Sequence, residues 1–195
     1  MWLRLFIIIS VLGALAVSLH YAPGNRILTP IDVLSIPVSA QTDPEWKAFS
    51  DERGTFSVML PGKPVEEDNS TDKVSGRKFT LATTAVFMVG YQDLPADFPY
   101  DLEQHKELLT QLWDGERDAV ISQSKAKLVS QTDILVDGHP GRLTKLQLTN
   151  GATYTGRELA VGKRLYQMFV ITRSEAEAMR FLDSFKVTQP KSEKS

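Results

Sequence analysis

Two stretches of the chain are largely apolar on both of their alternating faces, and this pattern constrains the fold more than any other feature. They are AVFMVGYQ at residues 85–92 and RLYQMFVIT at residues 164–172. Successive side chains of a strand point to opposite faces of its sheet, so a strand that is apolar on both faces needs a cover on each face. We therefore expect both stretches to be interior strands of one antiparallel sheet that lies between two other layers.

Three dipeptides in the second half of the chain indicate tight turns: Asp137-Gly138, Asn150-Gly151 and Gly162-Lys163. Asn-Gly and Asp-Gly adopt the positive φ angles that such turns require, so these dipeptides predict hairpins. The stretches around them predict strands at residues 128–136, 141–149, 152–161 and 164–172. Earlier strands are expected at residues 46–49, 55–60, 78–83 and 85–92.

Apolar side chains at helical spacing predict two helices. The first spans residues 102–121, where Asp101 and Gln104 predict a capping box and one side carries Leu108, Leu109, Leu112, Trp113, Ala119 and Val120. Ser174 and Glu177 predict a second capping box before a short helix whose apolar side is Ala178, Phe181, Leu182 and Phe185. The predicted fold class is therefore α+β, an antiparallel β-sheet flanked by helices in an α/β/α sandwich.

Residues 1–40 are expected to lie outside this domain, as a signal peptide or an N-terminal membrane anchor. Arg4 precedes an apolar run at residues 5–17, which would rise about 20 Å as a helix, short of a bilayer core of about 30 Å. Val38-Ser39-Ala40 offers the small residues of a cleavage site between Ala40 and Gln41. Cleavage would leave a soluble exported protein, whereas retention would leave one anchored by residues 1–20. Either way, residues 41–188 form the domain and residues 189–195 a flexible tail.

Composition excludes several classes of function. The net charge is −2 and the acidic and basic residues are interspersed, so the chain lacks the basic surplus of nucleic-acid-binding proteins. There is no cysteine, which excludes disulfides, thiolate metal sites, a cysteine nucleophile and a lipid-modified N-terminal cysteine.

The stretch GTFSVMLPGKP at residues 54–64 resembles a phosphate-binding loop but lacks its parts. A P-loop needs a glycine, four further residues, then Gly-Lys and a hydroxyl residue, but here Ser57 lies five residues before Gly62 and Pro64 follows Lys63. The alternation of Phe56, Val58 and Leu60 instead predicts a strand that Pro61-Gly62 ends. We expect no nucleotide binding.

Few residues suggest catalysis or a metal. No G-x-S-x-G nucleophile motif occurs, so the chain is not expected to be an enzyme. His105, His139, Asp93 and Asp97 are weak candidates for a metal site, but acidic residues near a helix start are also explained by the helix dipole. We expect no metal and no cofactor.

Arg142, Arg157 and Arg164 lie on the predicted hairpins and could form a cationic patch that binds an acidic partner, with Tyr154 beside it. The alternative is that the arginines form an alternating polar face with Glu158 nearby, and that Tyr154 belongs to the rim of the core.

Several motifs resemble small exported domains that are common in cyanobacteria and related to the PsbP family, the extrinsic lumenal proteins of photosystem II. They are WKAF at residues 46–49, GTFSVMLPGKP at 54–64, DGHPGR at 137–142, Gly156-Arg157, RLYQ at 164–167 and FLDSFK at 181–186. The resemblance covers about residues 45–187. It implies the PsbP-like α/β/α sandwich, a location in the periplasm or thylakoid lumen, and binding to a membrane complex whose metal cofactor the family helps to assemble or retain.

Together these features predict an exported, non-enzymatic domain that binds another protein, as an accessory or assembly factor for a membrane complex such as photosystem II. An alternative of a different class stays open: a carrier of a small apolar ligand in a cavity between sheet and helix.

Overall fold

The structure is a computed structural model that describes residues 45–51, 55–71, 74–99 and 102–188. The predicted leader, the cleavage site at Ala40 and Gln41, the cap residue Asp101 and the tail lie outside these residues. Within them, no helix is long and apolar enough to cross a membrane.

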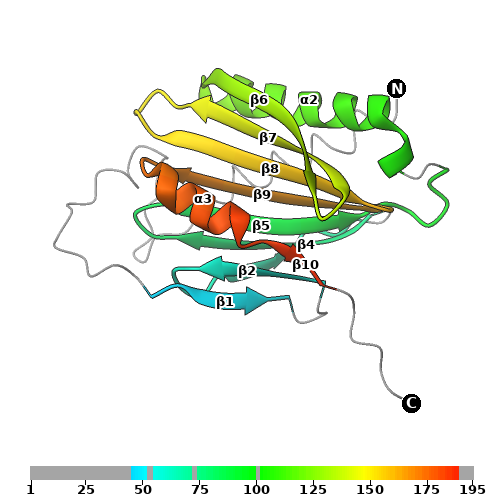
Figure 1. The fold of residues 1–195 in the computed structure, drawn as a ribbon, viewed down its shortest axis with the longest axis horizontal. Coiled ribbons are helices and arrows are strands. Elements are labelled where there is room, and N and C mark those ends of the chain that lie inside the picture. The colour runs from blue at the N-terminus through cyan, green and yellow to red at the C-terminus, as the bar shows by residue number, and fades with distance from the viewer. Residues whose placement is uncertain (1–44, 52–54, 72–73, 100–101, 189–195) are drawn as a thin grey trace, which may run out of the picture.

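A seven-stranded antiparallel sheet forms the centre of the fold, with the strand order β3-β4-β5-β9-β8-β7-β6 (Figure 1). Its strands are β3 (Val65–Asp68), β4 (Ser75–Ala82), β5 (Val86–Asp93), β6 (Lys127–Val136), β7 (His139–Gln147), β8 (Thr153–Val161) and β9 (Arg164–Thr172). A second sheet has the order β1-β2-β10, with β1 (Lys47–Ser50), β2 (Phe56–Leu60) and β10 (Lys186–Val187).

The prediction that residues 85–92 and 164–172 form interior strands is confirmed. These residues correspond to β5 and β9, which pair with each other in the middle of the large sheet, with Val89 opposite Met168. One face of the pair packs against α2 (Lys106–Ser124) through Val86 and Phe169. The other packs against α3 (Glu175–Asp183) and the small sheet (Figure 1).

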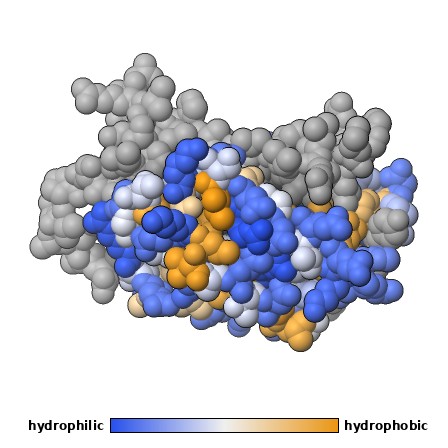
Figure 2. All heavy atoms as spheres, turned by 90° about the horizontal axis from the view of Figure 1, so that it is seen from above, coloured by the Kyte–Doolittle hydropathy of each residue, from blue (hydrophilic) through white to orange (hydrophobic). Residues whose placement is uncertain are grey.

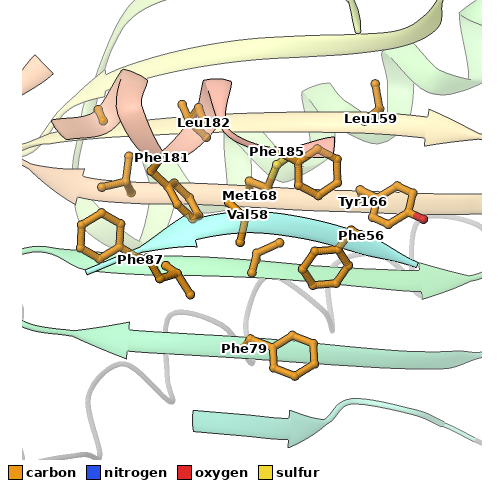
Figure 3. Packing of buried hydrophobic residues seen from close by; sticks show 14 of the residues in the cluster. Phe56, Val58, Phe79, Phe87, Leu159, Tyr166, Met168, Phe181, Leu182 and Phe185 are labelled. Carbon is orange, nitrogen blue, oxygen red and sulfur yellow. The ribbon is translucent and has the colours of Figure 1, made fainter. Parts of the chain in front are cut away.

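Phe56 of β2 lies at the centre of the core between the two sheets. It is fully buried, and its ring contacts Phe79, Tyr166 and Phe185 at centroid distances of 5.8, 6.3 and 5.8 Å (Figure 3). Because the buried residues Phe56, Val58 and Leu60 alternate with half-buried ones, β2 turns one apolar face onto the large sheet. The short strand β2 thereby covers the aromatic core.

The α+β class is confirmed, but the fold is richer in sheet than a helix-flanked sandwich. The small sheet shares one face of the large sheet with α3, so one cover is not purely helical. Strands β3 and β10 were not predicted, because VEED is charged and β10 has only two residues. Neither carries an apolar alternation long enough to be recognised.

The helix starts differ from their predictions. Residues 102–104 form a 3-10 turn, and α2 begins at Lys106, where the side chain of the N-cap residue His105 does not cap the helix. The turn buries Leu102 fully against the α2 side of the sheet.

Ser174 does cap α3, since its hydroxyl accepts from the Glu177 N–H at 3.2 Å. The Glu177 carboxylate instead accepts from the Thr172 hydroxyl at 2.6 Å, so only half of that capping box forms.

Phe185→Ala should lower the free energy of unfolding by about 3–5 kcal/mol, because it removes a buried ring that stacks on Phe56 and contacts Tyr166. Denaturant unfolding of the full chain measures the change. Leu135→Ala, at a side chain that is 75% exposed, is the control and should stay within about 0.5 kcal/mol of wild type. Equal midpoints for Phe185→Ala and wild type would show that this ring is not part of the core.

Candidate functional site

A row of mostly polar residues crosses all seven strands of the large sheet at one register, which we call the polar row. Each member is directly opposite the next: Glu67, Lys78, Gly90, Gln167, Glu158, Arg142 and Asp133, from β3 to β6. Its middle lies on the face that α2 covers, where Gln167 bonds to Glu116 of α2 and Arg142 bonds to Asp114 of α2. A face that is otherwise apolar therefore carries a line of charged groups under a helix.

Two carboxyl groups beneath α2 influence each other electrostatically: Glu116 from the helix and Glu158 from β8. Burial raises the pKa of Glu116 to about 8, with partial relief from the hydrogen bond of Gln167. Burial also raises the pKa of Glu158, the charge of Glu116 raises it further, and Arg142 opposes the shift. Glu158 is 6% exposed, and its Oε2 has no hydrogen-bond partner among the described residues. At neutral pH this pair therefore keeps at least one proton.

Arg142 is the charged group that ties α2 to the far end of the sheet. Its Nη1 donates to Asp114 of α2 at 2.8 Å and its Nε donates to Asp133 of β6 at 2.8 Å. The guanidinium also lies 5.3 Å from the ring centroid of Trp113, and only 4% of the residue is exposed. Arg117 extends the network by donating to Asp114 and to Gln131 of β6, each at 2.8 Å.

A small cavity of about 40 Å³ lies beside Glu116 and Gly90. Lys78, Glu116, Gln167 and Asn69 line it, and the Asn69 Oδ1 atom is buried without a hydrogen-bond partner among the described residues. A Cβ atom at Gly90 would lie 2.7 Å from the carbonyl oxygen of Arg77, so only glycine fits there. The space suits one or two water molecules rather than an apolar ligand.

A second feature lies at the β6 edge of the sheet, and we call it the docking face. It consists of the exposed apolar residues Leu128, Val129 and Leu135 of β6 and an adjoining open groove of about 500 Å³. The groove lies between α2 and the β6–β7 hairpin. Its apolar lining consists of Leu109, Trp113, Ile134, Leu135, Pro140 and Gly141. Its polar lining consists of Glu103, Lys106, Thr110 and Asp133. Figure 2, seen from the side of α2 and β6, shows hydrophobic patches on a largely hydrophilic surface.

The three arginines predicted to form a cationic patch do not share a surface. Arg142 is buried under α2, whereas Arg157 is buried on the opposite face. There Arg157 donates to the Leu182 carbonyl at 2.6 Å and to Asp183 at 2.7 Å, so it caps the end of α3. Arg164 forms a bidentate pair with Asp93 at 2.5 and 2.7 Å. Arg142 and Arg157 are paired inside the fold and the half-buried Arg164 is paired with Asp93, so the three side chains do not form one exposed cationic patch.

Tyr154 is also buried rather than displayed. It is 5% exposed and packs on Phe169 beneath α2, at a centroid distance of 5.2 Å. Burial raises the pKa of Tyr154, and the charges of Glu158 and Glu116 add to the shift. Its ring therefore belongs to the core and stays neutral.

The weak metal candidates are separated. His139 Nδ1 lies 3.1 Å from Oε1 of Glu103, which also accepts from the Gly162 N–H at 2.7 Å. Asp93 pairs with Arg164, while His105 is the N-cap of α2 and Asp97 is exposed in the preceding loop. Within the part of the chain that the structure describes, no three metal-binding side chains come together.

The carboxyl pair was not predicted from the sequence, although one signal for it was present. A two-residue turn at Gly162-Lys163 fixes the pairing of β8 with β9, and this pairing places Glu158 opposite Gln167. Two polar residues opposite each other in buried strands indicate a polar site beneath the cover. Nothing local in the sequence indicates that Glu116 is the helical residue above them.

No protein-family model matches the chain, and no curated protein matches its sequence. Among solved structures, the chain is similar to cyanobacterial PsbP (CyanoP) from Synechocystis sp. PCC 6803, with a TM-score of 0.52 and 13% identity over 77% of this chain and 97% of that one. A protein of unknown function from Pseudomonas aeruginosa, PA94, has a TM-score of 0.36 and 16% identity over 68% of this chain and 85% of its own. The first similarity shows that this chain has a PsbP-like fold.

Arg142→Met should lower the free energy of unfolding by roughly 1.5–3 kcal/mol, because it leaves Asp133 and the buried Glu158 without their cation and leaves Asp114 with Arg117 alone. Denaturant unfolding of the full chain at neutral pH measures the loss. Lys145→Met on the same strand breaks only the more exposed pair with Glu175 and should lower stability much less than Arg142→Met does. Equal losses for the two variants would contradict a special role for the buried network.

Proposed function

We propose that the protein is an exported, non-enzymatic accessory factor that binds a protein partner through the docking face. The partner belongs to a membrane complex, of which photosystem II is the example that the resemblance to the PsbP family implies. Residues 1–40 direct export to the periplasm or thylakoid lumen and insert in the membrane during that process. The proposal rests on a difference between the two edge strands of the large sheet: β3 is short and charged, whereas β6 is long and exposes apolar residues.

The β3 edge is protected against pairing with another chain. Its strand has only four residues, VEED, of which three are acidic, and its neighbour β4 neutralises two of them through Arg77–Glu66 and Lys78–Glu67 pairs of 2.6 and 2.9 Å. Short, charged edge strands are the usual way in which proteins prevent edge-to-edge association.

The β6 edge lacks this protection over most of its length. It has ten residues, contains no proline, and exposes 48% of Leu128, 60% of Val129 and 75% of Leu135. The pairing with β7 is irregular only between Leu128 and Ser130, so residues 131–136 form a regular strand with one side unpaired. An unpaired edge next to an apolar groove suits a partner that adds a strand and inserts a side chain.

The alternative of an apolar-ligand carrier receives less support. The small cavity between the sheet and α2 has a volume of about 40 Å³, and charged and amide side chains contribute to its lining, whereas pockets for small ligands usually exceed about 300 Å³. The larger groove is open along the β6–β7 hairpin, and Glu103, Lys106 and Asp133 contribute to its lining. A groove of this kind favours a polypeptide over a fully enclosed ligand.

Leu135→Asp should reduce recovery of the partner at least about tenfold in a pull-down from native membranes with the tagged full chain, because it places a charge in the middle of the docking face. Val65→Asp makes the same change at an exposed residue of the opposite edge and should leave recovery unchanged. Recovery of the same protein by wild type and Leu135→Asp would exclude the β6 edge as the binding surface. Loss of recovery with both variants would point to general misfolding, which a melting curve would reveal.

A further inference from the structure

We propose that the docking face binds an extended polypeptide segment that adds antiparallel to β6. The segment carries a large apolar residue opposite Leu135 and, two positions further on, a basic residue opposite Asp133. This inference rests on the proposed function, because it names the chemistry of the partner that the docking face takes.

The turn between β6 and β7 determines which backbone groups of β6 are already bonded. In a two-residue turn the residue before the turn accepts a hydrogen bond from the residue after it, so Val136 and His139 form a hydrogen-bonded pair. Hydrogen-bonded and non-hydrogen-bonded pairs alternate along an antiparallel ladder, and Leu135 opposite Pro140 is a pair of the second kind. Pro140 agrees with this assignment, because proline has no N–H to donate.

Three alternate residues of β6 therefore direct their N–H and C=O groups away from β7: Gln131, Asp133 and Leu135. Strand β6 is the last of the large sheet, so within the part of the chain that the structure describes no further strand pairs with these groups. The pairing with β7 is regular over residues 130–136. An added antiparallel strand would form hydrogen bonds with all three residues.

The side chains of the same three residues lie on the face that α2 covers. Gln131 accepts a hydrogen bond from Arg117 of α2 at 2.8 Å, and Leu135 lines the groove beside α2. Asp133 accepts from Arg142 at 2.8 Å. A residue opposite each of them on an added strand turns its side chain to this same face. Two partner residues that are two positions apart would thus face Leu135 and Asp133.

The groove favours a large apolar side chain opposite Leu135. Leu109 and Trp113 are buried in its lining, whereas Leu135 is the most exposed large apolar side chain among the described residues. The volume of about 500 Å³ leaves room for an aromatic ring that covers Leu135 and removes it from water. Glu103 and Lys106 add opposite charges near the start of α2, and these offset each other.

The charges of the docking face favour a basic residue opposite Asp133. Arg142 bonds only to Oδ1 of this carboxylate, so Oδ2 has no partner among the described residues. The cations of the network are also its more buried groups. The side chains of Arg142 and Arg117 are 5% and 19% exposed, against 50% for Asp133 and 66% for Asp118. The surface that a partner meets beside β6 is therefore negative.

Binding of short synthetic peptides to the full chain, held in micelles of an uncharged detergent, tests this chemistry. The probe is the dye-labelled peptide Thr-Thr-Phe-Thr-Lys-Thr-Thr, whose phenylalanine lies opposite Leu135 when its lysine lies opposite Asp133. Fluorescence anisotropy gives its Kd after subtraction of binding to empty micelles. Replacement of the lysine by glutamate should weaken binding at least about fivefold, because a like-charge pair replaces an opposite-charge pair.

Methylation of single peptide nitrogens tests the strand pairing. In the antiparallel arrangement the phenylalanine N–H points towards β6, whereas the N–H of the threonine that follows it points away. N-methylation of the phenylalanine should therefore weaken binding at least about tenfold. N-methylation of that threonine is the matched control and should change Kd by less than about twofold.

Failure of the probe to bind would overturn the proposal. So would equal Kd values for the lysine and glutamate peptides, or equal effects of the two methyl groups. Val65→Asp should bind the probe like wild type, and Leu135→Asp should not bind it; equal binding by these two variants would place the site elsewhere. If Leu135→Asp loses the native partner but wild type does not bind the probe, the docking face stands and only the basic, strand-adding segment is rejected.

Discussion

The pairing of β5 with β9 is the interaction on which the rest of the fold depends. Both strands are apolar on both faces, so their eight paired positions cannot be exposed on either side without a large hydrophobic cost. The chain supplies one cover from its middle, as α2, and the other from its two ends, as the small sheet and α3. Elements far apart in sequence are thereby held together through two neighbouring strands.

The polar row is the exception within this apolar centre, and it gives the sheet a unique register. A shift of β8 by one residue would turn Glu158 to the face that packs against the small sheet and α3, and Arg157 to the face that α2 covers. Both charged groups would then lose their partners. Buried ionic groups are a weak source of stability compared with well-packed apolar residues. Their value here is that they permit one alignment of the strands and one position of α2.

The sequence predicted local structure well and distant structure poorly. The hairpin turns were recognisable because Asp137 and Gly138 both have positive φ angles, of 51° and 87°, which few residues other than Asp, Asn and Gly adopt. Strand β10 and the second sheet were missed, since β2 recruits a two-residue partner from the opposite end of the chain. The sequence left two interpretations of the arginines open, because an alternating pattern shows which face a residue occupies only after the covers of both faces are known. Glu116 has no distinctive local pattern; only the packing of α2 shows what it faces.

The position of the small sheet has a consequence for how the domain is presented to its surroundings. The chain enters the described fold beside β1 and leaves it after β10, and both strands flank β2 on that sheet. The small sheet packs over β5, and β6 lies four strands further along, or about 19 Å at the usual strand spacing (Figure 1). If residues 1–40 tether the protein to a bilayer, the domain acts as a spacer that holds β6 away from the lipid. Under the proposed function, such a spacer would favour the protruding loops of a membrane complex over its segments within the bilayer.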